Sequence, residues 1–138
     1  MSVPVNQRSH GKLEVCIKAH ELCCYTLKIT ANDKIFVPQF HESLTKHIED
    51  MALEVHILCW EANNVVVKST EEFKMRQRYQ DEAAIKCNVL LSLIDMAKNL
   101  FHLTTKRVTY WSNLVIETRN LIRKWRESDT TRYQEFRV

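Results

Sequence analysis

Apolar residues recur at helical spacing along most of this chain, and the pattern divides it into four amphipathic segments. They cover about residues 12–30, 38–63, 70–102 and 105–127. Steps of three and four residues place side chains on one face of a helix. Ser69 with Glu72 predicts a capping box that opens the third helix, and Thr104 predicts a cap for the fourth. The sequence therefore predicts a single domain over residues 1–138, with a polar tail that frays from Ser128.

The same spacing predicts which face of each helix is buried. The expected core stripes are Leu13, Ile17, His20, Cys24 and Leu27; Leu44, Ile48, Met51, Val55 and Leu58; Ala83, Cys87, Leu90, Ile94, Ala97 and Phe101; and Val108, Trp111, Val115, Thr118, Ile122 and Trp125. The stripes of the third and fourth helices alternate steps of three and four residues, which is typical of the seam of a helix bundle.

From Gln39 to Val138 the chain contains no glycine or proline. Average usage would place about twelve there, and strand-and-turn folds need these residues where the backbone reverses. We therefore expect an all-α protein, an antiparallel up-down four-helix bundle.

The third helix carries a second apolar row, which is largely opposite its core stripe. The row contains Ile85, Val89, Leu93, Met96 and Leu100, with Leu103 beyond them. A helix that is apolar on two faces is buried on two faces, and a single bundle covers only one. We expect the second row to form an oligomer interface. The alternative is a splayed bundle in which a terminal segment covers this row.

Positive charge is concentrated at the C-terminal end. Residues 104–138 hold 8 Lys or Arg against 4 Asp or Glu, whereas residues 1–103 hold 12 against 13. Arg119, Arg123 and Arg126 fall on one helical face, with Lys124 nearby. Guanidinium groups match phosphate oxygens, so this stripe is a candidate nucleic-acid surface. It equally fits a solvated helix face, since the sequence pI is only about 8.6.

Other basic residues extend this candidate set. Lys12 and Arg107 are included as nucleic-acid-binding candidates. Lys74, Arg76 and Arg78 are weaker candidates because acidic neighbours surround them, and of these Arg76 and Arg78 hint weakly at partner binding.

Catalytic signatures are missing from the sequence. None of the six histidines has a glutamate three residues before it, as a di-metal bundle needs, and there is no phosphate loop or nucleophile elbow. The five cysteines lack paired spacing and are expected to be buried packing residues. No segment has the length and apolarity to cross a membrane. We therefore expect a cytoplasmic, non-enzymatic protein without metal or cofactor.

The order of the four segments resembles a bacterial and phage four-helix-bundle family. The resemblance covers about residues 11–128 and is carried by YTLKIT, WEAN, RQRYQDEA and RNLIRKWRES. The family includes the accessory variability determinant (Avd) proteins of diversity-generating retroelements and the proteins encoded by intervening sequences of large-subunit ribosomal RNA genes. Where similar sequences place several basic residues near the start of the second helix, this chain has Gln39, His41, Glu42, Lys46 and His47, which weakens part of the expected positive surface.

The resemblance implies a ring-shaped homopentamer with a positively charged surface. It implies a reverse transcriptase and its template RNA or cDNA as partners, and an accessory role in mutagenic cDNA synthesis. The alternative is a structural or protein-interaction bundle of the intervening-sequence type with no nucleic-acid role.

Overall fold

The computed structural model describes residues 10–137, with side-chain surroundings described from Glu14 onward. Over this range the chain is all-helical and has no strand. Its long helices are α2 (His10–Thr30), α3 (Lys46–Asn64), α4 (Thr70–Leu100) and α5 (Thr105–Arg132). The expected all-α class and packed four-helix arrangement are confirmed.

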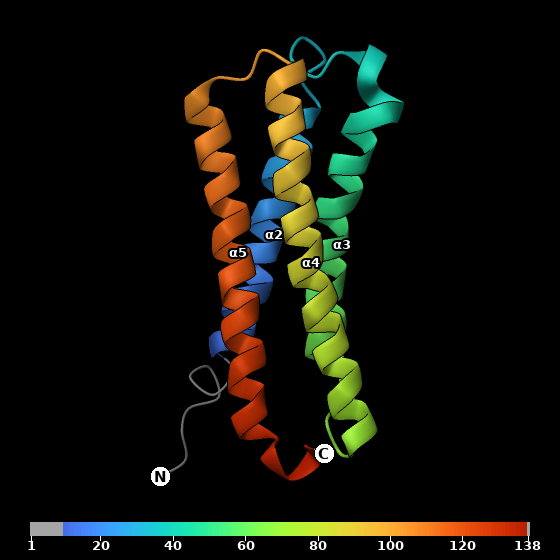
Figure 1. The fold of residues 1–138 in the computed structure, drawn as a ribbon, viewed down its shortest axis with the longest axis vertical. Coiled ribbons are helices and arrows are strands. Elements are labelled where there is room, and N and C mark those ends of the chain that lie inside the picture. The colour runs from blue at the N-terminus through green and yellow to red at the C-terminus, as the bar shows by residue number, and fades with distance from the viewer. Residues whose placement is uncertain (1–9, 138) are drawn as a thin grey trace.

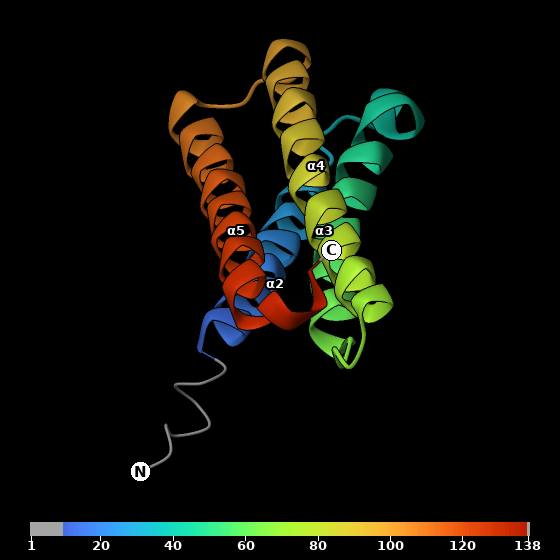
Figure 2. The ribbon, with the colours of Figure 1, turned by 60° about the horizontal axis from the view of Figure 1, so that its bottom comes forward.

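Each long helix packs against two others around a shared core (Figures 1 and 2). The neighbouring pairs are α2 with α3, α3 with α4, α4 with α5, and α5 with α2. In Figure 1, α4 runs from the bottom of the view to the top and α5 runs back down. The N-terminal end of α4 and the C-terminal end of α5 therefore lie at the same end of the bundle.

The segment expected to form one helix from Pro38 is divided into three parts. It begins with the 3₁₀ turn η1 (Pro38–Phe40), continues through the π-helical turn η2 (His41–Thr45) and becomes α-helical only at Lys46. Pro38 suits a first helical position because it has no N–H to leave unpaired. The wide turn leaves Leu44 and Thr45 buried.

Side-chain caps fix the starts of α4 and α5. Ser69 Oγ accepts a hydrogen bond from the Glu72 backbone N–H at 3.3 Å, and the Glu72 carboxylate accepts one from the Lys68 N–H at 2.8 Å. Thr104 Oγ1 accepts from the Arg107 N–H at 3.1 Å. Both predicted caps are confirmed.

The predicted core stripes of α4 and α5 are confirmed apart from Val108, which is partly buried. That of α3 is confirmed apart from Met51, which is also partly buried.

The prediction for α2 was wrong. Ile17 and Leu27 are exposed, whereas the core face consists of Val15, Ala19, Leu22, Thr26 and Ile29. Both stripes have helical spacing, and the buried one contains the smaller Ala19 and the polar Thr26. Trp111 Nε1 donates to Thr26 Oγ1 at 2.9 Å, so this buried hydroxyl is satisfied.

Aromatic rings close the end of the bundle where α4 leads into α5. The Phe36 and Phe101 ring centroids are 4.9 Å apart, and Trp111 lies edge-on to Phe36 at 6.1 Å. At the opposite end, aromatic rings pack around a buried pair of charged residues.

Candidate nucleic-acid interface

The three predicted arginines of α5 lie on the flank that faces α4. Arg119 Nη1 donates to Asn88 Oδ1 at 2.9 Å, and Arg126 donates through Nε and Nη2 to the Asp81 carboxylate. Arg123 lies between them and is exposed. The stripe is therefore one surface, in which two guanidinium groups also bridge α5 to α4.

Arg126 has its charge partly offset by Asp81. Its Nη2 is 3.3 Å from Asp81 Oδ2, and the two side chains are 37% and 49% exposed. An exposed pair of this kind stabilises a fold by only about 0.2–1 kcal/mol. Replacing Asp81 should therefore reduce the free energy of unfolding only slightly. Its carboxylate weakens the electrostatic attraction between Arg126 and a phosphate.

The other predicted residues do not join this flank. Lys124 lines a separate surface hollow together with Glu14 and Lys18 of α2. Arg107 is in the first turn of α5, whereas Arg126 lies near the opposite end of the same helix. Lys12 is in α2, but its side chain lies outside the described part of the chain. The six candidates therefore do not form one continuous site.

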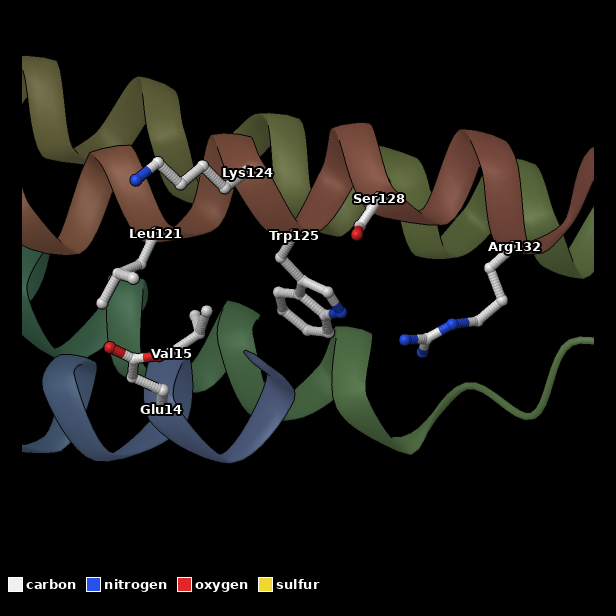
Figure 3. A pocket seen from close by; sticks show the side chains of 7 residues that line it. All are labelled: Glu14, Val15, Leu121, Lys124, Trp125, Ser128 and Arg132. Carbon is white, nitrogen blue, oxygen red and sulfur yellow. The ribbon is translucent and has the colours of Figure 1, made fainter. Parts of the chain in front are cut away.

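Lys124 instead borders a cavity of about 200 Å³ between α5 and the start of α2 (Figure 3). The Trp125 indole projects from α5 toward α2 and forms the centre of its wall. Lys124 and Arg132 supply positive charge, whereas Glu14 supplies a carboxylate. The charges in this cavity are mixed, so it favours no anion strongly.

A buried ion pair at the charged end of the bundle was missed by the sequence analysis. Arg76 Nε donates to Asp129 Oδ2 at 2.6 Å, Gln80 Nε2 donates to the same oxygen at 2.8 Å, and Arg76 Nη1 donates to the Ala62 carbonyl oxygen at 3.3 Å. Arg76 and Asp129 are both fully buried. The Arg76 guanidinium also lies over the Trp125 ring, 5.0 Å from its centroid.

This network corrects two expectations. The chain does not fray from Ser128, because α5 continues to Arg132 and a 3₁₀ turn, η3, follows over Gln134–Phe136. Arg76 is not available to a partner, because it is an internal part of the fold. The signal was present in the sequence: Arg76 and Gln80 continue the stripe of Ala83, and Asp129 falls four residues after Trp125.

A second cavity, of about 250 Å³, lies beside this network on the α4 flank. Its lining comes from the first turns of α4, the last turns of α5 and the chain after η3 begins: Phe73, Lys74, Gln77, Arg126, Thr130, Phe136 and Arg137. Three of these side chains are cationic and none is acidic. The sequence analysis had identified Arg126 and, weakly, Lys74, but not their proximity.

The second apolar row of α4 lies largely on the outer side of the helix. Ile85, Val89, Met96 and Leu100 are 57%, 40%, 49% and 47% exposed. Leu93 differs, because it packs partly against the core. Four of the five residues expected at an oligomer interface are therefore accessible in the single chain.

The cysteines behave as packing residues. All five are free thiols, and Cys16, Cys23, Cys59 and Cys87 are buried. Burial raises the pKa of Cys87 to about 12, although Arg119 and Arg123 oppose the shift. Across the described residues, no group of three or more His, Cys, Asp or Glu side chains could hold a metal ion.

An exposed apolar area with two histidines lies between α2 and α3. The His20 and His56 ring centroids are 5.8 Å apart, and both rings line a shallow cavity together with Ile17 and Trp60. His20 Nε2 is 3.6 Å from Cys24 Sγ. Burial, and then the neighbouring His20, lowers the pKa of His56.

No family model, curated protein or solved structure matches this chain. Among the described helices, none combines the length and apolar character that crossing a membrane would require.

Proposed function

We propose that this chain is a non-enzymatic accessory subunit of a diversity-generating retroelement, of the Avd type. It binds the reverse transcriptase and template RNA or cDNA and supports mutagenic cDNA synthesis in the cytoplasm. The family assignment rests on the resemblance of the four helical segments. The observation that carries nucleic-acid binding is the arginine flank of α5, where Arg119, Arg123 and Arg126 share one surface.

The proposed protomer is an antiparallel up-down bundle, and five protomers form a ring. The exposed α4 row supports an assembly, because burying Ile85, Val89, Met96 and Leu100 removes apolar surface from water. Repetition of the α5 flank around a ring multiplies a modest charge into a continuous positive surface. Each arginine flank would position the nucleic acid electrostatically, because contacts to phosphates fix the position of a strand without reading its base sequence.

The test combines mass by light scattering with RNA binding over a salt series. Arg119, Arg123 and Arg126 are replaced together by Gln, and a matched variant replaces the exposed Lys28, Lys34 and Lys98 by Gln. Each lost phosphate contact should reduce the slope of log K against log salt by about 0.7 for single strands. We expect a reduction of about 2 for the arginine variant and little change for the lysine variant, with equal helicity. Equal slopes would remove the arginine flank from the proposal.

The second candidate is a structural or protein-interaction bundle of the intervening-sequence type. The exposed apolar area of Ile17, Ile57 and Trp60 on α2 and α3 favours it, because such a surface suits a protein partner. A wild-type chain that binds no RNA at any salt concentration would favour this second function.

A further inference from the structure

We infer that the cavity between the first turns of α4 and the end of α5 is a binding site for one phosphorylated nucleotide. Its ligand class is a nucleoside phosphate, either free or at the end of a single strand. The site adds a ligand to the proposed function. It depends on that function only if the ligand is the phosphorylated end of a nucleic-acid strand, because a free nucleotide could bind without it.

The charge of this cavity favours an anion. Lys74, Arg126 and Arg137 line it, and none of the described residues contributes a carboxylate to the lining. The nearest acidic partner, Asp81, occupies Nε and Nη2 of Arg126, so Nη1 is not used by that pair. Among the described residues, neither Lys74 nor Arg137 is held by an ion pair. Ammonium and guanidinium donors together suit the oxygens of a phosphate.

The neutral lining residues add to this preference. Gln77 supplies an amide donor, whereas the Thr130 hydroxyl already donates to the Glu127 carbonyl oxygen at 2.6 Å. Lys74 and Gln77 lie three residues apart in the second turn of α4, so their side chains are neighbours on one helix face. Four side chains from three segments can therefore donate to one phosphate group.

The two phenylalanines of the cavity have different roles. Phe73 is buried, and its ring centroid is 5.9 Å from that of Tyr133, so it forms the floor. Phe136 is only half-buried and offers the ring face on which a base can stack. A phosphate site beside an aromatic ring is typical of nucleotide recognition rather than of simple ion binding.

The cavity volume limits the size of the ligand. The volume is about 250 Å³. Typical pockets for drug-sized ligands begin at about 300 Å³. The cavity therefore accommodates a phosphate with part of one nucleoside, while further nucleotides must extend outside it. The adjoining flank of Arg126, Arg123 and Arg119 offers a path along α5 for such a strand.

The buried network next to the cavity holds its walls in place. Asp129 anchors the end of α5 to Arg76 of α4, and Arg76 lies over the Tyr133 ring, 5.5 Å from its centroid. Tyr133 in turn contacts Phe73 of the floor. The helix ends on both sides of the cavity are therefore held together by packing that the ligand does not have to create.

The experiment measures binding of the full chain to two pairs of probes: a nucleoside monophosphate and the same nucleoside, and a short single-stranded RNA with and without a terminal phosphate. Inorganic phosphate is a fifth probe. We expect the phosphorylated member of each pair to bind more tightly. Replacing Lys74 and Arg137 together by Gln should weaken its binding about tenfold or more, because each removes charge-assisted hydrogen bonds. Lys98→Gln, on the exposed far end of α4, is the matched control and should leave binding unchanged.

Phe136→Leu separates nucleotide recognition from simple anion binding. It should weaken binding of the nucleoside monophosphate about tenfold through lost stacking and leave inorganic phosphate binding unchanged. Helicity of every variant is checked by circular dichroism. If Phe136→Leu weakens binding of the nucleoside monophosphate and of inorganic phosphate equally, or weakens neither, the stacking role of Phe136 is overturned.

The outcomes separate this site from the proposed function. RNA binding that ignores the terminal phosphate and survives loss of Lys74 and Arg137 overturns the nucleotide site and leaves the arginine flank intact. Binding of the mononucleotide without any RNA binding supports the site and contradicts the accessory role. Binding of no probe overturns both.

Discussion

Arg76 and Asp129 are 53 residues apart in sequence, yet they form a fully buried ion pair with an Nε to Oδ2 distance of 2.6 Å. The pair joins the second turn of α4 to the last turn of α5. Removing one partner of a buried pair leaves an uncompensated charge, which costs more than the intact pair contributes. The stability of the charged end of the bundle therefore depends on both residues together.

Asp129→Ala should destabilise the protein by about 3–5 kcal/mol. Gln80 Nε2 would also lose its acceptor. Chemical denaturation monitored by circular dichroism measures the effect. The control is Glu127→Gln, an exposed change two residues earlier on the same helix. A loss below about 1 kcal/mol would show that water reaches and solvates Arg76 readily in the variant.

The course of α5 shows what the sequence could reveal and what it could not. The apolar stripe through Trp111, Ile122 and Trp125 predicted its core face correctly, because these large apolar residues follow one line at helical spacing. Its end at Arg132 was not predicted, because Asp129 is held in the core by a residue on another helix. Local polarity at Ser128 indicated fraying. The spacing of Asp129 from Trp125 pointed to the core face, but only the partner Arg76 on another helix explains why a carboxylate is buried there.

The candidate site also has one part that the sequence predicted and one part that it could not predict. Helical spacing correctly grouped Arg119, Arg123 and Arg126, since they belong to one helix. It could not reveal that Asp81 and Asn88 face them, or that Lys74 and Arg137 meet across the end of the bundle, because these proximities arise from packing between helices. For α2, two stripes of equal spacing competed, and both contain large apolar residues, so only packing against the neighbouring helices decides that Leu22 and Ile29 are buried while Ile17 and Leu27 are exposed.

Acidic substitution on the outer row of α4 should reduce assembly without unfolding the chain. Val89 and Met96 are the appropriate positions, since both are well exposed, whereas Leu93 also contacts the core. We expect Val89→Asp with Met96→Asp to lower the mass by light scattering to that of one protomer. Val66→Asp, at the most exposed apolar residue of the α3 to α4 link, is the control. An unchanged mass with retained helicity would place the interface elsewhere.

Asp81→Asn should increase nucleic-acid affinity. The change removes the carboxylate that pairs with Arg126 and leaves its guanidinium available to a phosphate. Stability should change by less than about 1 kcal/mol, because the pair is exposed. The measurement is the salt dependence of RNA binding, which should become steeper. Asp95→Asn makes the same exchange farther along α4 and should have a smaller effect; equal effects would mean that net charge, and not Arg126, controls binding.

Thiol modification should distinguish Cys24 from the other four cysteines. Burial raises the pKa of Cys16 to about 11 and that of Cys87 to about 12, and it also raises those of Cys23 and Cys59. The thiolate is the reactive form, so these four should react slowly in the folded protein. Mass spectrometry after brief alkylation should find one modified site, and Cys24→Ser should abolish it. Rapid labelling of Cys59 would indicate that the core opens.

The lowered pKa of His56 makes stability depend on pH. Burial is the main cause, and the neighbouring His20 adds to it. The unfolded chain therefore binds a proton at this site more readily than the folded chain, so stability falls as the pH drops below about 6.5. Thermal unfolding across this range should show a smaller decline for His56→Gln than for the wild type. His102→Gln, at an exposed position after α4, should decline as the wild type does. If His56→Gln retains the full decline, another group carries the pH dependence, and the apolar area between α2 and α3 tolerates a charged imidazole.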